Sequence, residues 1–198
     1  TEDGLIVRSD DVDDAQFTAI SNSPKCRILF AVGGMLIGAN GSLSEGGTQI
    51  ASGVDFWFSS NEHDYTGWIP STLADPTNSV AAWGPLYSPA GAIVAGGALG
   101  HRAVLYKRGS IFVGQYTGPI DKWLFDCVSE SIGCVGPDAL VVAQDRHWFC
   151  SGDNFYVFDG SRPVPIGDKL RDWFSANTFA GEMPTMSGAY DPTHNAII

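Results

Sequence analysis

Short apolar runs separated by glycine and asparagine turns dominate the chain, which is the pattern of β-strands joined by tight turns. The clearest case is residues 26–38, where two apolar runs flank Gly33-Gly34. Both glycines can adopt the positive φ angles of a two-residue turn, so this segment predicts a β-hairpin. We expect Asn40-Gly41 to close that unit and residues 54–59 to form an aromatic strand.

Two further units follow an irregular segment, residues 61–85, which predicts a long surface loop. Strands are predicted at residues 92–95, 102–106, 111–114, 140–143, 147–150, 155–158, 163–166 and 187–190. Gly96-Gly97 is expected to be a hairpin turn. One helix is predicted over residues 169–175, capped by Asp168, because Leu170, Trp173 and Phe174 would share a face.

Two of these units overlay. Leu105-Tyr106, four turn residues and then residues 111–113 match Phe149-Cys150, four turn residues and then residues 155–157, at an offset of 44 residues (105 to 149 and 111 to 155). A period of about 40 to 50 residues with several strands per unit is that of a β-propeller blade. The expected fold class is therefore all-β, a partial β-propeller with one short helix. A β-sandwich or a mixed β domain is the open alternative.

The same pattern divides the chain into two regions. Residues 1–54 hold the N-terminal strands and the first hairpin unit, and residues 55–198 hold the propeller-like region. The sequence begins without Met, and residues 196–198 resemble the opening of a strand. We therefore expect a piece of a longer polypeptide, truncated at its C-terminal end.

Composition agrees with a globular β protein and argues against nucleic-acid binding. Hydrophobic residues make up 44% of the 198 residues and charged residues only 17%, with 24 glycines and 11 prolines. The net charge is −11, and the few basic residues are scattered, whereas a nucleic-acid-binding surface needs clustered Lys and Arg. No apolar run of about 18 residues occurs, so no membrane span is predicted.

Candidate metal ligands are present but lack the required spacing. An acidic run could bind calcium, yet it lacks the glycine and the closing glutamate of an EF-hand loop, so a solvated turn is favoured. That run comprises Asp10, Asp11, Asp13 and Asp14. The histidines, His63, His101, His147 and His194, form no metal-binding pair. The cysteines, Cys26, Cys127, Cys134 and Cys150, form no C-x-x-C pair and are expected to be reduced and structural.

The segment 59–68 gathers two acids, a histidine and aromatic residues. Glu62 and Asp64 are too close in sequence to predict the separation of a glycosidase carboxylate pair, so we interpret the segment as a polar turn. Tyr65 and Trp68 could serve as subunit-interface anchors, or could pack against their own blade. With no nucleophile elbow and no phosphate-binding loop, we expect neither an enzyme nor a cofactor.

Several segments in order resemble the tail and nozzle structural proteins of bacteriophages, in particular the podovirus packaged-DNA stabilisation family. The matching segments are residues 56–68 (a Trp-rich strand with Asp64 and Trp68), 104–119, 128–137, 155–167 and the Trp173-Phe174 pair. The resemblance covers about 140 residues and leaves out most of residues 1–54.

The resemblance implies a structural virion protein. Copies of it would form an oligomeric ring around the DNA exit channel of the phage tail, assembled in the host cytoplasm. Its partners would be other copies of itself and portal, adaptor and other tail proteins. During ejection DNA would pass without specific binding, and no membrane would be involved. The alternative is a carbohydrate-binding or receptor-binding propeller of a phage tail. A sialidase-type enzyme is disfavoured because no Asp-box repeats occur.

Overall fold

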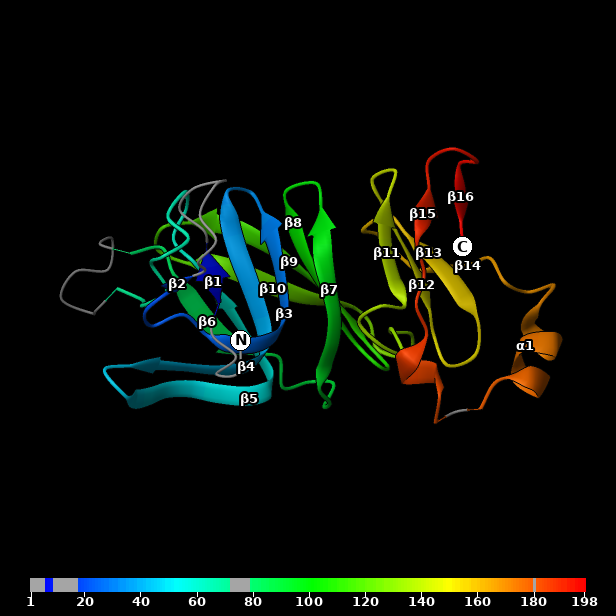
Figure 1. Cartoon of the computed structure of the whole chain (residues 1–198), viewed down its shortest axis with the longest axis horizontal. Coiled ribbons are helices and arrows are strands. Elements are labelled where there is room, and N and C mark those ends of the chain that lie inside the picture. The colour runs from blue at the N-terminus through cyan, green and yellow to red at the C-terminus, as the bar shows by residue number, and fades with distance from the viewer. Residues whose placement is uncertain (1–5, 9–17, 72–78, 180) are drawn as a thin grey trace.

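Three four-stranded antiparallel sheets dominate the computed structural model, which describes residues 6–8, 18–71, 79–179 and 181–198 (Figure 1). The first sheet contains β3 (Lys25–Val32), β4 (Met35–Glu45), β5 (Thr48–Ser59) and β6 (Ala82–Pro85). The second contains β7 (Ile93–Leu99), β8 (Arg102–Lys107), β9 (Ile111–Gly118) and β10 (Lys122–Ser129). The third contains β11 (Leu140–Ala143), β12 (Arg146–Cys150), β13 (Phe155–Phe158) and β14 (Val164–Pro165). Each sheet pairs its strands in chain order. The all-β prediction is confirmed.

The hairpin predicted around Gly33-Gly34 is confirmed, but the prediction that Asn40-Gly41 closes this unit is wrong. Gly33 and Gly34 have φ angles of 55° and 79° between β3 and β4. Asn40-Gly41 is not a turn but a bulge inside β4, where the Asn40 amide donates to the Ile93 carbonyl at 2.9 Å. A Cβ on Gly41 would lie 1.9 Å from the Lys25 oxygen, so only glycine fits. The turn lies further on, at Gly46-Gly47.

The predicted division between residues 54 and 55 falls inside β5, so one sheet holds residues of both predicted regions. The loop predicted over residues 61–85 ends in a strand, β6, which pairs with β5. Pro85 is compatible with β6 because β6 is an edge strand, where a missing backbone donor costs no ladder hydrogen bond.

The 44-residue overlay corresponds to equivalent strands. β8 and β12 are the second strands of their sheets, and β9 and β13 are the third. The turns between them also match, since the Lys107 amide donates to the Ser110 carbonyl and the Ser151 amide donates to the Asn154 carbonyl, both at 2.9 Å. Each residue of the first bond lies 44 positions before its counterpart in the second. The sequence repeat is therefore a repeat of local structure.

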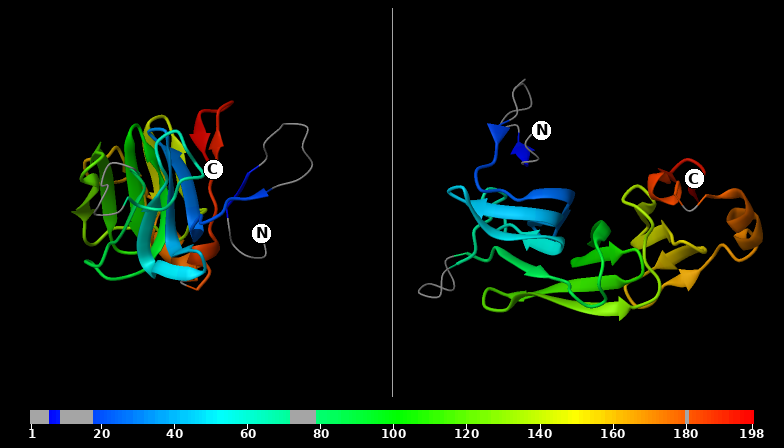
Figure 2. Two further views of the ribbon diagram at one scale, coloured as in Figure 1. Left: turned by 90° about the vertical axis from the view of Figure 1, so that its left-hand side faces the viewer. Right: turned by 90° about the horizontal axis from the view of Figure 1, so that it is seen from below.

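The sheets follow one another along an arc and approach through their first strands (Figure 2, right). β3 lies beside β7, and β7 lies beside β11. Gly96 and Gly97 lie within β7 at this approach, so the hairpin turn predicted there is wrong. A Cβ on Gly96 would lie 2.7 Å from Phe30 of β3, and one on Gly97 would lie 2.9 Å from Val142 of β11. The two glycines face opposite sides because successive residues of a strand alternate.

The core occupies the two spaces between the three sheets. Ala103 and Leu105 of β8 belong to the cluster shared with the first sheet, whereas Val104 and Tyr106 belong to the cluster shared with the third. Strand β8 of the second sheet is thus buried on both faces. The other face of the first sheet is covered by a third cluster, which includes Phe58 and Trp68.

The remaining elements flank this core. They are β1 (Val7–Arg8), β2 (Thr18–Ala19), α1 (Arg171–Asn177), a 3₁₀ turn (Met183–Thr185), β15 (Tyr190–Asp191) and β16 (Ala196–Ile197). The helix begins two residues later than predicted, and Asp168 does not cap it: Leu170 is the N-cap residue and makes no side-chain capping bond. β15 and β16 pair with each other, and β15 lies beside β11.

Candidate functional site

The predicted anchor residues lie in the loop that covers the first sheet, and they have different exposures. Trp68 is 1% exposed, and its indole N–H donates to the Tyr65 carbonyl at 2.9 Å. Trp68 therefore packs against its own sheet, which is the second of the two alternatives that the sequence left open. Tyr65 is 46% exposed, and its proposed role at an interface remains a prediction.

The same loop uses its polar groups to hold its own shape. The Asp64 carboxylate accepts hydrogen bonds from the Thr66 amide at 3.0 Å and the Thr66 hydroxyl at 2.6 Å, and these bonds lower its pKa. The Asn61 side-chain oxygen accepts from the Val80 and Ala81 amides. The carboxylate of Asp64 is thus held in a turn and forms no acid–base pair with Glu62.

The histidines lie in separate parts of the structure, and His147 is buried with both of its ring nitrogens hydrogen-bonded. His147 lies between the second and third sheets, where its Nε2 contacts the Ala98 carbonyl at 2.9 Å and its Nδ1 contacts the Tyr106 hydroxyl at 2.9 Å. Because a carbonyl can only accept, Nε2 carries the proton and Nδ1 accepts from Tyr106. Burial lowers the pKa of His147, so its neutral form is favoured.

Within the described ranges no group of three or more His, Cys, Asp or Glu side chains could hold a metal ion. The acidic run that we considered for calcium, residues 10–14, lies outside these ranges. The four cysteines are free, and burial raises the pKa of Cys26 and Cys134 to about 11 and that of Cys150 to about 12. No helix in the described part of the chain is long and apolar enough to cross a membrane.

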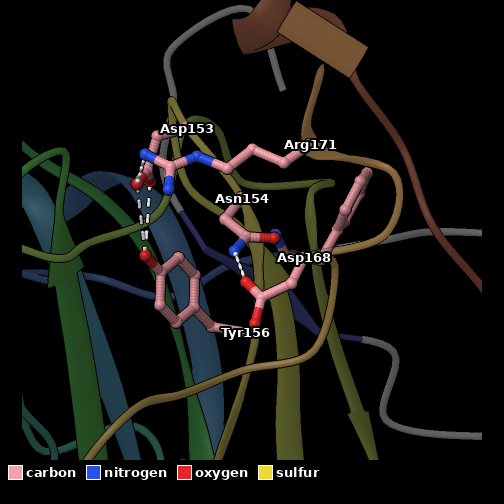
Figure 3. A network of polar contacts seen from close by, with 6 residues as sticks. Asp153, Asn154, Tyr156, Asp168 and Arg171 are labelled. Atoms are coloured by element: carbon pink, nitrogen blue, oxygen red, sulfur yellow. Dashed lines mark hydrogen bonds and ion pairs between the residues drawn. The ribbon is translucent and has the colours of Figure 1, made fainter. Parts of the chain in front are cut away.

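A polar network fixes the segment before α1 to the β12–β13 turn (Figure 3). Asp153 in this turn accepts from the Tyr156 hydroxyl at 3.3 and 3.4 Å and lies 3.7 Å from the Arg171 guanidinium. Beside it, the Asn154 amide donates to Asp168 at 2.8 Å. Both carboxylates are occupied by these contacts, so the network holds structure in place and is not arranged for proton transfer.

The most distinctive surface is an apolar cleft beside the third sheet. Its volume is about 530 Å³, and its lining comes from the third sheet and the C-terminal segment. Val142 of β11 faces the second sheet at Gly97, so the neighbouring Val141, which lines the cleft, lies on the opposite face. It is lined mainly by Val141, Trp148, Phe155, Ile166, Leu170 and Ile197. Its Leu170 side chain is 57% exposed.

Helix α1 and the segment just after it add exposed apolar side chains outside the cleft. Phe174 is buried against Phe155, with ring centroids 5.0 Å apart, whereas Trp173 and Phe179 point into solvent. Large apolar side chains that are exposed near an apolar cleft are frequent at interaction sites. This end of the molecule is therefore our candidate interaction surface.

A search of known protein families finds none that matches this chain, and a search of curated proteins finds no similar one.

Sequence reasoning found part of this surface. The sequence predicts that Leu170, Trp173 and Phe174 share one face of the helix. In the structure Phe174 is the buried residue of α1, and Leu170 and Trp173 are exposed. A short helix with one buried side chain leaves its other large apolar residues, here Leu170 and Trp173, exposed, and their presence in the sequence indicates an exposed apolar surface. The cleft itself was not predicted, because it depends on how the third sheet meets β15 and β16.

Proposed function

We propose that this chain is a structural component of a phage tail, built as consecutive blades of a β-propeller and assembled into an oligomeric ring around the DNA exit channel. The observation that carries the proposal is the stacking of three four-stranded sheets through their first strands. Such stacking is the arrangement expected of neighbouring blades.

The segments that resemble phage tail proteins lie at structurally important places. Residues 104–119 span β8 and β9, and residues 128–137 connect the second sheet to the third. Residues 155–167 contain β13, β14 and Gly167. A Cβ on Gly167 would lie 2.3 Å from the Asn154 side-chain oxygen, so the turn needs glycine. The resemblance thus concerns residues that build and join two sheets, which supports a shared fold.

Surface chemistry supports a scaffold in contact with other proteins. The net charge of −11 would repel DNA and let it pass along a channel without adhering. Trp173 and Phe179 are exposed and lie outside the apolar cleft, and large aromatic side chains are frequent anchors of protein interfaces. They are the contact residues that we propose between subunits.

The test measures the assembly state of the full-length protein. Light scattering should give a mass that is a multiple of the subunit mass, and electron microscopy should show closed rings with a central opening. A Trp173→Ser variant should shift the mass towards the monomer, whereas the control Leu124→Ser, on an exposed edge strand, should not. A full-length protein that stays monomeric alone and with portal and adaptor proteins would refute the proposal.

A second candidate function is glycan binding at the outer part of the first sheet. Phe56 stacks on Trp83 with ring centroids 5.8 Å apart and meets Tyr87 edge-on at 6.4 Å, and both partners are exposed. Such aromatic faces can pack against the C–H groups of a sugar ring while polar groups stay hydrated. Binding on a glycan array that is lost in Trp83→Ala and kept in Trp173→Ser would favour this candidate, and no binding would remove it.

A further inference from the structure

The apolar cleft lies on a face of the third sheet that the C-terminal segment covers only in part. Strand β8 of the second sheet is buried on both faces, and the centre of the outer face of the first sheet is covered by the cluster that includes Phe58 and Trp68. At this cleft Ile166, just after β14, and Leu170, at the start of α1, are more than half exposed and line the same space as Trp148 of the third sheet. A face of this composition is stabilised when another apolar layer packs on it.

The inner part of this face already carries the β15–β16 hairpin. β15 lies beside β11 as β11 lies beside β7 and β7 beside β3. Gly188, just before β15, approaches the third sheet so closely that its Cβ would lie 2.9 Å from Val141. Gln144, in the β11–β12 turn, donates to the Tyr190 hydroxyl at 3.3 Å and also to Asn195. The hairpin therefore occupies the place of the first two strands of a sheet.

The outer edge of β16 is open. Ala189 and Ile198 exchange two backbone hydrogen bonds, at 2.7 and 2.9 Å. In an antiparallel ladder the next pair is not hydrogen-bonded, so the N–H and C=O groups of Ile197 point away from β15. In each complete sheet the second strand pairs on both sides. Among the residues that the structure describes, β16 pairs with β15 alone, at the border of the cleft that Ile197 lines.

We propose that the apolar cleft is the seat of two further β-strands, which add to the free edge of β16 and complete a fourth four-stranded sheet. One face of these strands is apolar and covers Trp148, Ile166 and Leu170. The strands belong to the same polypeptide, because in each of the three complete sheets the four strands are consecutive along the chain. This inference rests on the packing of the sheets and is independent of the proposed role in a phage tail.

A second copy of the chain is a less suitable occupant. Continuing the stack with a second copy would bring the outer face of its first sheet onto the cleft. That face is already covered by the loop that contains Trp68 and by Ile20 next to β2. Contact with a second copy is therefore one of the outcomes that would overturn the proposal.

The first experiment places a photoreactive benzoylphenylalanine at position 170 of the protein made from its complete natural gene. Cells grown on ¹⁴N and ¹⁵N are mixed, so that mass spectrometry separates links within one molecule from links between copies. The expected result is a link within one molecule to a segment outside residues 1–198. The matched control is Leu124, which is equally exposed at 57% but lies on β10 away from the cleft, and should give no link to that segment.

The second experiment measures backbone hydrogen exchange at Ile197 without any substitution. In the chain of residues 1–198 this amide should exchange at the rate of an open amide, and in the complete protein it should be slowed by about 100-fold or more. Links confined to residues 1–198, links between light and heavy copies, or equally fast exchange of Ile197 in both proteins would each overturn the proposal. If the photoreactive variant does not fold, the exchange measurement decides.

Discussion

The buried pair of Tyr106 and His147 allows a quantitative prediction. Both side chains are fully buried between the second and third sheets, and the Tyr106 hydroxyl donates to His147 at 2.9 Å. In Tyr106→Phe the aromatic ring stays, including its contact with Phe149 at a centroid distance of 5.0 Å. The variant loses one hydrogen bond and leaves Nδ1 of His147 without a donor in a site closed to water. We expect the free energy of unfolding to fall by about 1–3 kcal/mol.

The assay is equilibrium unfolding in urea, followed by tryptophan fluorescence, with the midpoint compared at equal slope. The control is Tyr190→Phe, which removes a hydroxyl bonded to Asn195 at 2.9 Å on the surface. Water can replace that bond, so the control should lose less than about 0.5 kcal/mol.

A double-mutant cycle tests the reasoning more strictly. Once His147 is replaced by Leu, the Tyr106→Phe substitution should cost less, because the hydroxyl it removes no longer has its partner. Equal losses in Tyr106→Phe and Tyr190→Phe, or strictly additive losses in the cycle, would refute the assigned hydrogen bond.

Three further predictions follow from groups in the core. Because burial lowers the pKa of His147, the unfolded chain binds a proton that the folded protein excludes. Stability should therefore be full above about pH 6.5 and fall as the pH drops below it, and the fall should be shallower in His147→Asn; parallel pH profiles would contradict this. Gly96→Ala, whose Cβ would lie 2.7 Å from Phe30, should lower the free energy of unfolding by about 1–3 kcal/mol, whereas Gly109→Ala, with open space around it, should change little. Equal unfolding midpoints for these two variants would contradict the close approach of β7 to β3. The thiols of Cys134 and Cys150 should react with a disulfide reagent at pH 8 only after unfolding, since burial raises their pKa values to about 11 and about 12; fast labelling of the folded protein would refute their burial.

The fold could be predicted from the sequence where its causes are local. Gly33-Gly34 between two apolar runs specifies a hairpin through backbone geometry alone, and the repeat at an offset of 44 residues reflects two turns with the same hydrogen bond. Gly96-Gly97 and Asn40-Gly41 were misinterpreted because glycine also permits close approach of two strands. Whether a glycine pair bends the chain or admits a neighbour depends on what packs beside it.

The candidate site was harder to predict because its contacts join distant segments. The network at the β12–β13 turn depends on Asn154 meeting Asp168, and both residues are also ordinary turn and helix-cap residues. From the sequence, Asp168 was assigned to the helix N-terminus, which lies two residues further on in the structure. Trp68 was considered both as a core residue and as an anchor, and only its position between the loop and the first sheet decides between them.

The burial of β8 on both faces has a consequence for how the sequence can change over time. Successive side chains of β8 point alternately into two different cores, so neither its odd-numbered nor its even-numbered positions face solvent. A substitution at Val104 must suit the third sheet, and one at Leu105 must suit the first. We expect relatives of this protein to diverge fastest in turns and edge strands, and slowest in β8. Two neighbouring positions of β8 would then covary with residues of different sheets rather than with each other.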